Sequence, residues 1–171
     1  MPRLKDFLTE LSKSLDDIEA ARKISGLGDA EIQESYLRSL GEKYKLGNVF
    51  FSQSGGQLII YMYEFLDRPT ISVNAKDHVA LAKFLQKKGL KTNSYGLHVN
   101  EQGSDKERGS IRIGIPQSDD YFHRYILFKP NEGGVLEIDY PLLRNPLTYD
   151  IAEYIENNLV RKRMSILCCS R

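Results

Sequence analysis

The middle of the chain consists of short apolar stretches separated by turns rich in glycine or charge. The first two stretches, residues 48–53 and 57–66, flank Ser54-Gly55-Gly56, a pattern typical of a β-hairpin. Strands joined by such brief connections favour an antiparallel sheet, because parallel neighbours need a crossover of a dozen or more residues. Further strands are expected over residues 70–73, 91–100, 110–115 and 135–140, whereas residues 117–129 fit either a helix or a strand.

Helices are predicted before, within and after this strand-rich region. Of these helices, the second along the chain is expected to begin with Asp29 as its N-cap. The third is expected to run from Lys76 to Lys88 and to stop at Gly89. Thr148 is expected to cap a last helix that continues to about Met164. The first helix, to about residue 24, carries a seam with heptad spacing, formed by Leu4, Leu8, Leu11, Leu15 and Ile18.

These elements predict an α+β fold, in which an antiparallel sheet of five or more strands is combined with an N-terminal helical hairpin, a middle helix and a C-terminal helix. A length of 171 residues fits one domain. Within it we expect a hairpin arm over residues 1–47, a sheet with one inserted helix over 48–146, and a C-terminal helix and tail over 147–171.

The charge balance, 24 Lys and Arg against 23 Asp and Glu, is neither that of a strongly basic duplex-DNA binder nor that of an acidic phosphate mimic. The charge is nevertheless unevenly placed, because residues 76–100 contain five lysines and one aspartate. A basic patch is therefore predicted, either as a solvated helix face or as a contact surface for phosphate or for an acidic protein. Its candidate residues are Lys76, Lys83, Lys87, Lys91, Arg108 and Arg112.

Motifs that carry chemistry are scarce. The chain has no phosphate-binding Walker loop and no set of four close Cys or His ligands for structural zinc, so no cofactor or metal is predicted. Glu137 and Asp139 share one face of a strand, either to hold a divalent cation or to face water while the residues between them face the core. His98 and His123 remain candidates for the centre of a small enzyme.

The chain has more apolar side chains than one small domain is expected to bury. The strand from residue 57 to residue 66 is apolar on both faces, and the C-terminal helix carries two apolar stripes. We therefore predict a homo-oligomer or a hetero-complex with another protein. The candidate partner-binding residues are Leu11, Tyr61, Tyr63, Val160, Met164 and Leu167.

The ends of the chain bear on its location. The first seventeen residues lack the apolar core of a secretory signal, and no apolar run reaches the length of a membrane span. Cys168 and Cys169 are adjacent and cannot cross-link distant parts of a fold, which favours a cytoplasmic protein. Beside basic residues 161–163, these cysteines are either a site of lipid acylation for peripheral membrane contact or exposed thiols on a frayed helix.

Three functional hypotheses follow. The first is a non-enzymatic protein-binding module, an adaptor, chaperone or inhibitor, that acts through amphipathic helices and an aromatic strand face. The second is an accessory protein that binds nucleic acid through the basic patch. The third is a small enzyme that uses the region of His98 and His123.

Overall fold

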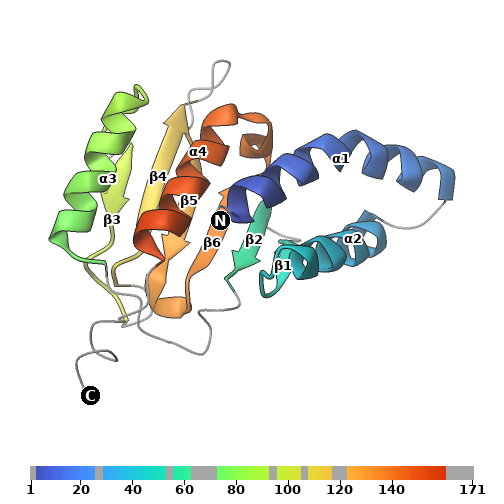
Figure 1. The fold of residues 1–171 in the computed structure, drawn as a ribbon, viewed down its shortest axis with the longest axis horizontal. Coiled ribbons are helices and arrows are strands. Elements are labelled where there is room, and N and C mark those ends of the chain that lie inside the picture. The colour runs from blue at the N-terminus through green and yellow to red at the C-terminus, as the bar shows by residue number, and fades with distance from the viewer. Residues whose placement is uncertain are drawn as a thin grey trace.

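The computed structural model describes residues 3–25, 29–52, 56–62, 73–92, 96–104, 108–116 and 123–160, without the side chains of 15–25 and 29–33. Its helices are α1 (Arg3–Ser25), α2 (Asp29–Lys43), α3 (Ala75–Lys87) and α4 (Pro146–Tyr154). Its strands are β1 (Val49–Phe51), β2 (Gln57–Tyr61), β3 (Leu97–Val99), β4 (Ile111–Pro116), β5 (His123–Lys129) and β6 (Val135–Asp139). Two 3-10 helices, η2 (Pro130–Glu132) and η3 (Tyr140–Arg144), flank β6, and a π-helical turn, η4 (Ile155–Leu159), extends α4 (Figure 1).

The six strands form one antiparallel sheet in the order β1-β2-β6-β5-β4-β3. This arrangement, with its N-terminal, middle and C-terminal helices, confirms the predicted α+β class. The long connection between β2 and β3 contains α3, and it allows β6 to pair with β2 in the middle of the sheet.

The two faces of the sheet differ because successive side chains of a strand point to opposite sides. One face is the core of the protein. Its buried side chains come from four neighbouring strands: Leu58, Ile60, Leu136, Ile138, Ile126, Phe128, Ile111, Ile113 and Ile115.

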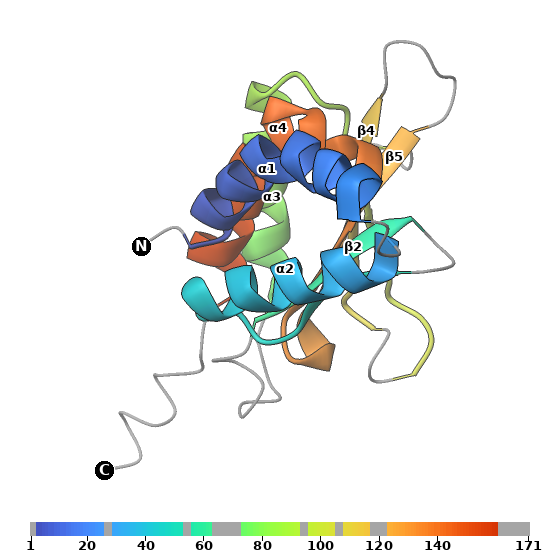
Figure 2. The same ribbon diagram turned by 90° about the vertical axis from the view of Figure 1, so that its right-hand side faces the viewer.

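Helices α1, α3 and α4 lie on this core face, in front of the strands in Figure 1 and together on one side of the sheet in Figure 2. The N-terminal half of α1 contributes Leu4, Phe7, Leu8 and Leu11, all fully buried. Ile151 and Ile155 of α4 and η4 are buried in the same core. The hairpin arm is therefore an integral part of the core at its inner end, and only its outer end extends past the sheet.

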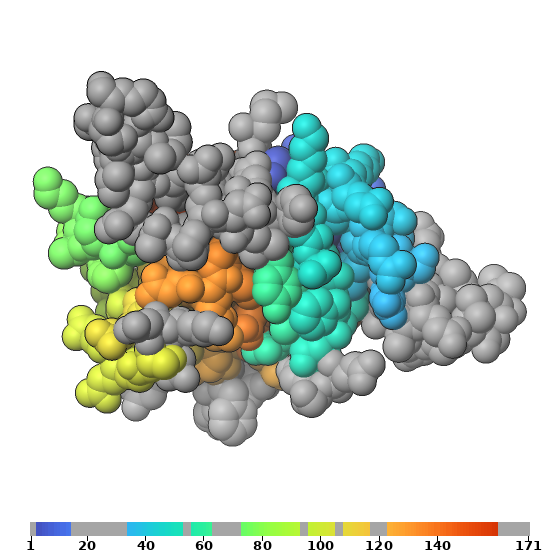
Figure 3. Space-filling view, turned by 90° about the horizontal axis from the view of Figure 1, so that it is seen from below, coloured from blue at the N-terminus to red at the C-terminus, as the bar shows by residue number. Residues whose placement is uncertain are grey.

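Helix α2 packs beside β1 at one edge of the sheet, where Figure 3 shows the two side by side. Leu37 and Leu40 are buried there. Gly41 permits this close approach, since a Cβ at that position would lie 3.0 Å from Val49 Cγ2.

Helix α3 has well-defined ends. Asn74 and Asp77 form a reciprocal capping box, in which the Asn74 side chain accepts from the Asp77 amide at 3.0 Å and the Asp77 side chain accepts from the Asn74 amide at 2.9 Å. At the other end Gly89 adopts a positive φ of 82°. Its amide donates to Gln86 and the amide of Leu90 donates to Leu85, the two hydrogen bonds of a Schellman motif. The predicted stop at Gly89 is thus correct.

Some sequence predictions need correction in their detail. Of the ambiguous residues 117–129, residues 123–129 form a strand, and residues 117–122 lie outside the described residues. Among the described residues of the predicted strand over 91–100, only β3 is a strand, and residues 93–95 lie outside the described part of the chain. Residues 140–144 form a 3-10 helix. The predicted strand over 70–73 falls almost entirely outside the described residues.

The start of the last helix also differs from the prediction. Its N-cap is Asn145, whose side chain accepts from the Leu147 amide at 3.0 Å, and not Thr148. Thr148 is buried one turn into the helix, and its hydroxyl donates to the carbonyl of Leu142 at 2.7 Å. Pro146 explains the shift, because its missing amide and fixed φ suit the first position of a helix.

Candidate functional site

Helix α3 is attached to the fold along one side only. Leu81 and Leu85 are fully buried beneath it, and the ring of Phe84 stacks on Tyr154 of α4 with centroids 4.4 Å apart. Lys88, just after the helix, pairs with Asp150 of α4 at 3.2 Å. These contacts fix the orientation of α3, and they leave its opposite side at the surface.

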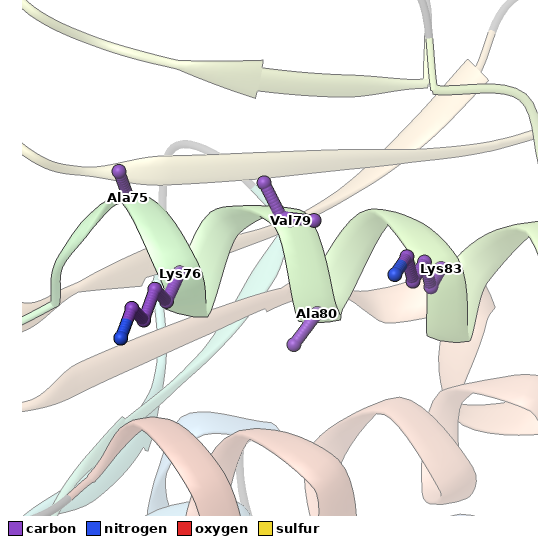
Figure 4. Close-up of a pocket in the computed structure, with 5 residues that line it drawn as sticks. All are labelled: Ala75, Lys76, Val79, Ala80 and Lys83. Atoms are coloured by element: carbon purple, nitrogen blue, oxygen red, sulfur yellow. The ribbon is translucent and has the colours of Figure 1, made fainter.

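A shallow groove of about 370 Å³ lies along this outer side, and the described residues that line it are Ala75, Lys76, Val79, Ala80 and Lys83. Figure 4 shows Val79 and Ala80 in the middle of the helix, with Lys76 and Lys83 on either side of them along its length. Val79 is 55% exposed, the largest value among the large apolar side chains of the described residues. An apolar floor between two lysines is a surface that a partner can cover favourably.

The lysines of α3 are available for a partner's charges. The side chains of Lys76, Lys83 and Lys87 are exposed, and no side-chain hydrogen bond or ion pair within the described parts of the chain involves them. At four and seven residue intervals they share one side of the helix with Val79 and Ala80. The sequence predicted this lysine stripe, but not the exposed Val79 between its members. The sequence does contain this signal, because Val79 stands three residues after Lys76 and four residues before Lys83, and such neighbours share one side of a helix.

The other predicted basic residues do not extend this stripe into one surface. Arg112 is exposed on β4, but it alternates with buried Ile111 and Ile113, so it points to the face of the sheet opposite α3. Lys91 is exposed beyond the end of α3, and Arg108 is exposed in the turn before β4. Because Arg112 and the α3 lysines lie on opposite sides of the sheet, the six predicted basic residues do not form one surface.

The second notable surface is the sheet face opposite the helices. A row of neighbouring side chains crosses all six strands on this face, in the order Phe50, Ile59, Glu137, Leu127, Arg112 and His98. Phe50 stacks on Tyr61 with ring centroids 5.9 Å apart, and the guanidinium carbon of Arg112 lies 4.8 Å from the centroid of the Tyr125 ring. Tyr61, predicted as a partner-binding residue, is half-buried on this face.

The two carboxylates singled out in the sequence also lie on this face, and both are already bonded. Glu137 accepts from Lys129 Nζ at 2.6 Å, and Asp139 accepts from the Tyr125 amide at 2.8 Å. Burial by itself would lower the pKa of Lys129, but the hydrogen bond and charge of Glu137, with a contribution from Glu132, raise it. Among the described residues no group of three His, Cys, Asp or Glu side chains is placed to hold a metal ion. Both carboxylates lie on the face of the sheet opposite the core, but the side chain of Glu137 is only 12% exposed.

His98 and His123 lie on the same face but far apart. His98 is opposite Arg112 and His123 is opposite Pro116, four residues further along β4. With about 3.3 Å per residue along a strand and about 4.8 Å between strands, their backbones are separated by roughly 16 Å. The structure thus does not bring these two imidazoles together into one catalytic pair.

The remaining predicted partner-binding residues fall into two groups. Leu11 and Val160 are 0% and 4% exposed, buried within the core of a single chain, so they offer no surface to a partner. The sequence could not show that α1 and α4 cover each other inside one chain. Tyr63, Met164 and Leu167 lie outside the described residues, as do Cys168 and Cys169. None of the helices that the structure describes combines the length and apolarity needed to cross a membrane.

Comparison of the chain with protein-family models, with curated proteins and with solved structures finds no match.

Proposed function

We propose that this protein is a protein-binding module that receives an acidic amphipathic helix of a partner protein in the groove on α3. The observation that carries the proposal is Val79, which is 55% exposed on an apolar floor between Lys76 and Lys83. An exposed valine does not stabilise a solvent-facing side of a helix, whereas a docked partner helix would remove the Val79 side chain from water.

The spacing of the groove defines the partner. Lys76 and Lys83 are seven residues apart, which is about 10.5 Å along a helix axis. A partner helix with acidic residues seven positions apart, and apolar residues between them on the same side, would match both lysines and cover Val79 and Ala80. Recognition of this kind places apolar anchors at i, i+3 or i+4, and i+7.

Nucleic acid is the alternative ligand for the same lysines. Phosphates would neutralise Lys76, Lys83 and Lys87, but a phosphate backbone makes no use of the apolar floor between them. In addition, Arg112 lies across the sheet and cannot contribute to a common phosphate track. The geometry therefore favours a protein partner, and nucleic-acid binding becomes an outcome that the experiment distinguishes.

The test is selection of helical peptides of about four turns from a display library, with the unsubstituted protein as the only bait. Dissociation constants of the selected peptides are then measured by fluorescence anisotropy. We expect acidic amphipathic sequences, and we expect Val79→Glu and Lys83→Glu each to raise Kd at least about tenfold. The matched control is Lys13→Glu, which makes the same charge change at an exposed residue of α1 and should leave Kd unchanged.

Two results would contradict the proposal. Selected peptides could bind the Val79→Glu variant as tightly as the original protein, which would place their site elsewhere. Alternatively, a single-stranded oligonucleotide could bind at low salt with an affinity that Lys83→Glu abolishes and Val79→Glu does not. In that case the stripe would be a phosphate contact.

A further inference from the structure

The edge of the sheet at β3 carries an inference that is independent of the α3 groove. We propose that this edge receives an extended segment of a partner protein, in which apolar and acidic residues alternate, as an added antiparallel strand. β3 is the last strand in the order of the sheet, and Figure 1 shows it as the outermost strand on the side of α3. Its backbone groups define the shape of the partner segment, and the side chains around them define its chemistry.

The hydrogen bonds between β3 and β4 show which backbone groups of β3 point outward. The Asn100 amide donates to the Ser110 carbonyl at 2.9 Å. Bonded pairs alternate along an antiparallel ladder, so the next residue that bonds to β4 is His98. The amides and carbonyls of Leu97 and Val99 therefore point away from β4. No hydrogen bond within the described parts of the chain occupies these four groups, and a strand laid along the edge would pair with them.

The side chains of the same two residues leave the core partly open at this edge. Leu97 and Val99 lie opposite Ile113 and Ile111 on the core face, and both are half-buried against the core. At the other edge of the sheet, Val49 of β1 is only 6% exposed, because α2 packs beside that strand. An added strand with apolar side chains on the core face would cover the β3 edge as α2 covers the β1 edge.

The opposite face of this edge is basic. His98 is exposed there beside Arg112, its neighbour on β4. Lys91 is exposed near the start of the strand, where its carbonyl would meet a Cβ built on Gly96. The acidic residue Glu101 lies two residues beyond the other end of β3. The residue of an added strand opposite His98 forms a non-hydrogen-bonded pair, in which side chains approach closely, so an acidic residue is favoured there.

A second copy of this chain is the other strand that fits the backbone of this edge. Antiparallel pairing of two β3 strands around a two-fold axis would place His98 opposite His98 of the second copy. Arg112 of each copy would lie on the same face, one strand further from the axis. Like charges opposed in this way repel, whereas an acidic partner segment complements them. The charge of the edge therefore favours a different protein as the partner.

The first test compares two labelled peptides of about seven residues, one in which valine alternates with glutamate and one in which it alternates with lysine. Fluorescence anisotropy with the full chain measures both dissociation constants. We expect the glutamate peptide to bind at least about tenfold more tightly. His98→Glu should abolish this preference, because it places a carboxylate opposite the glutamates. The control is Lys83→Glu on the outer side of α3, which should leave the preference unchanged.

A second test addresses the hydrogen bonds and uses the original protein alone. In the proposed register the valines of the peptide lie opposite Leu97 and Val99, so their amides face β3 and the glutamate amides face away. N-methylation of the valine amides should abolish binding, and N-methylation of the glutamate amides should leave Kd unchanged. Loss of binding from both methylation patterns, or from the glutamate pattern alone, would overturn the proposal.

Three further results would also overturn it. Binding of neither peptide would show that the short, charged edge keeps other strands away. Binding of the glutamate peptide that Lys83→Glu abolishes would place that peptide in the α3 groove. Sedimentation of the original chain as a dimer that the glutamate peptide dissociates would assign the edge to a second copy.

Discussion

Glu156 is a single residue that joins the two ends of the fold. Its side chain is 6% exposed, and it accepts hydrogen bonds from Arg3 Nε and from the Leu4 amide, each at 2.9 Å. It thereby caps the first turn of α1 from the π-helical turn that follows α4, at the end where the helix dipole favours a carboxylate.

We expect Glu156→Gln to lower the free energy of unfolding by roughly 2 kcal/mol, since a mostly buried Arg3 loses its counter-charge. Urea unfolding at neutral pH measures the loss. The control is Glu153→Gln, which removes a partly exposed carboxylate 3.7 Å from Lys5 and should cost much less. Equal losses for the two variants would show that burial of Glu156 has no special role.

Glu10 provides a pH-dependent contact between α1 and the end of α2. Hydrogen bonds from Lys43 at 2.6 Å and from Tyr44 at 2.7 Å hold the pKa of the Glu10 carboxyl below its usual value. A carboxyl group whose pKa is lowered by folding stabilises the folded state at pH values above its pKa in the unfolded chain. This stabilisation is lost as the pH falls through its pKa in the folded protein. The stability difference between the original protein and Glu10→Gln should therefore be present at pH 7 and vanish in strong acid, in urea titrations at several pH values. A difference that is constant with pH would contradict this assignment.

At the scale of the element, α3 depends on the box formed by Asn74 and Asp77. We expect Asn74→Ala to lower the free energy of unfolding by about 1 kcal/mol. Because the two side chains cap each other's backbone amides, the double variant with Asp77→Ala should lose less than the sum of the two single variants. Thermal or urea unfolding of all four proteins measures this coupling, and strict additivity would show that the two hydrogen bonds act independently.

At the scale of the whole molecule, the N-terminal arm cannot be removed from the core. Burial of Leu4, Phe7, Leu8 and Leu11 contributes about 2 kcal/mol per side chain, so their sum rivals the 5–15 kcal/mol that stabilises a typical domain. A chain that begins at Asn48 should therefore lack a cooperative unfolding transition. Circular dichroism during thermal unfolding tests this, and a sharp transition would establish the sheet as an independent unit.

Much of the local structure follows from short sequence signals. Gly89 ends α3 as expected, because only a residue at ease with positive φ closes a Schellman motif without strain. The alternation of Ile111 and Ile113 with Arg112 shows which strand residues are buried, since that period is a property of the chain itself. Thr148 was wrong as a cap because Asn145 and Pro146 together form a better start one turn earlier.

The sequence by itself determined the α+β class, the capped middle helix and the lysine stripe, since periodicity and capping act over a few neighbouring residues. Only the tertiary structure decided that Leu11 is covered within one chain, that Val79 is left exposed, and that Arg112 and the α3 lysines lie on opposite sides of the sheet. These outcomes depend on strand register and on which helices cover which face. Both are set by packing between segments that are distant in the chain, and no local pattern records that packing.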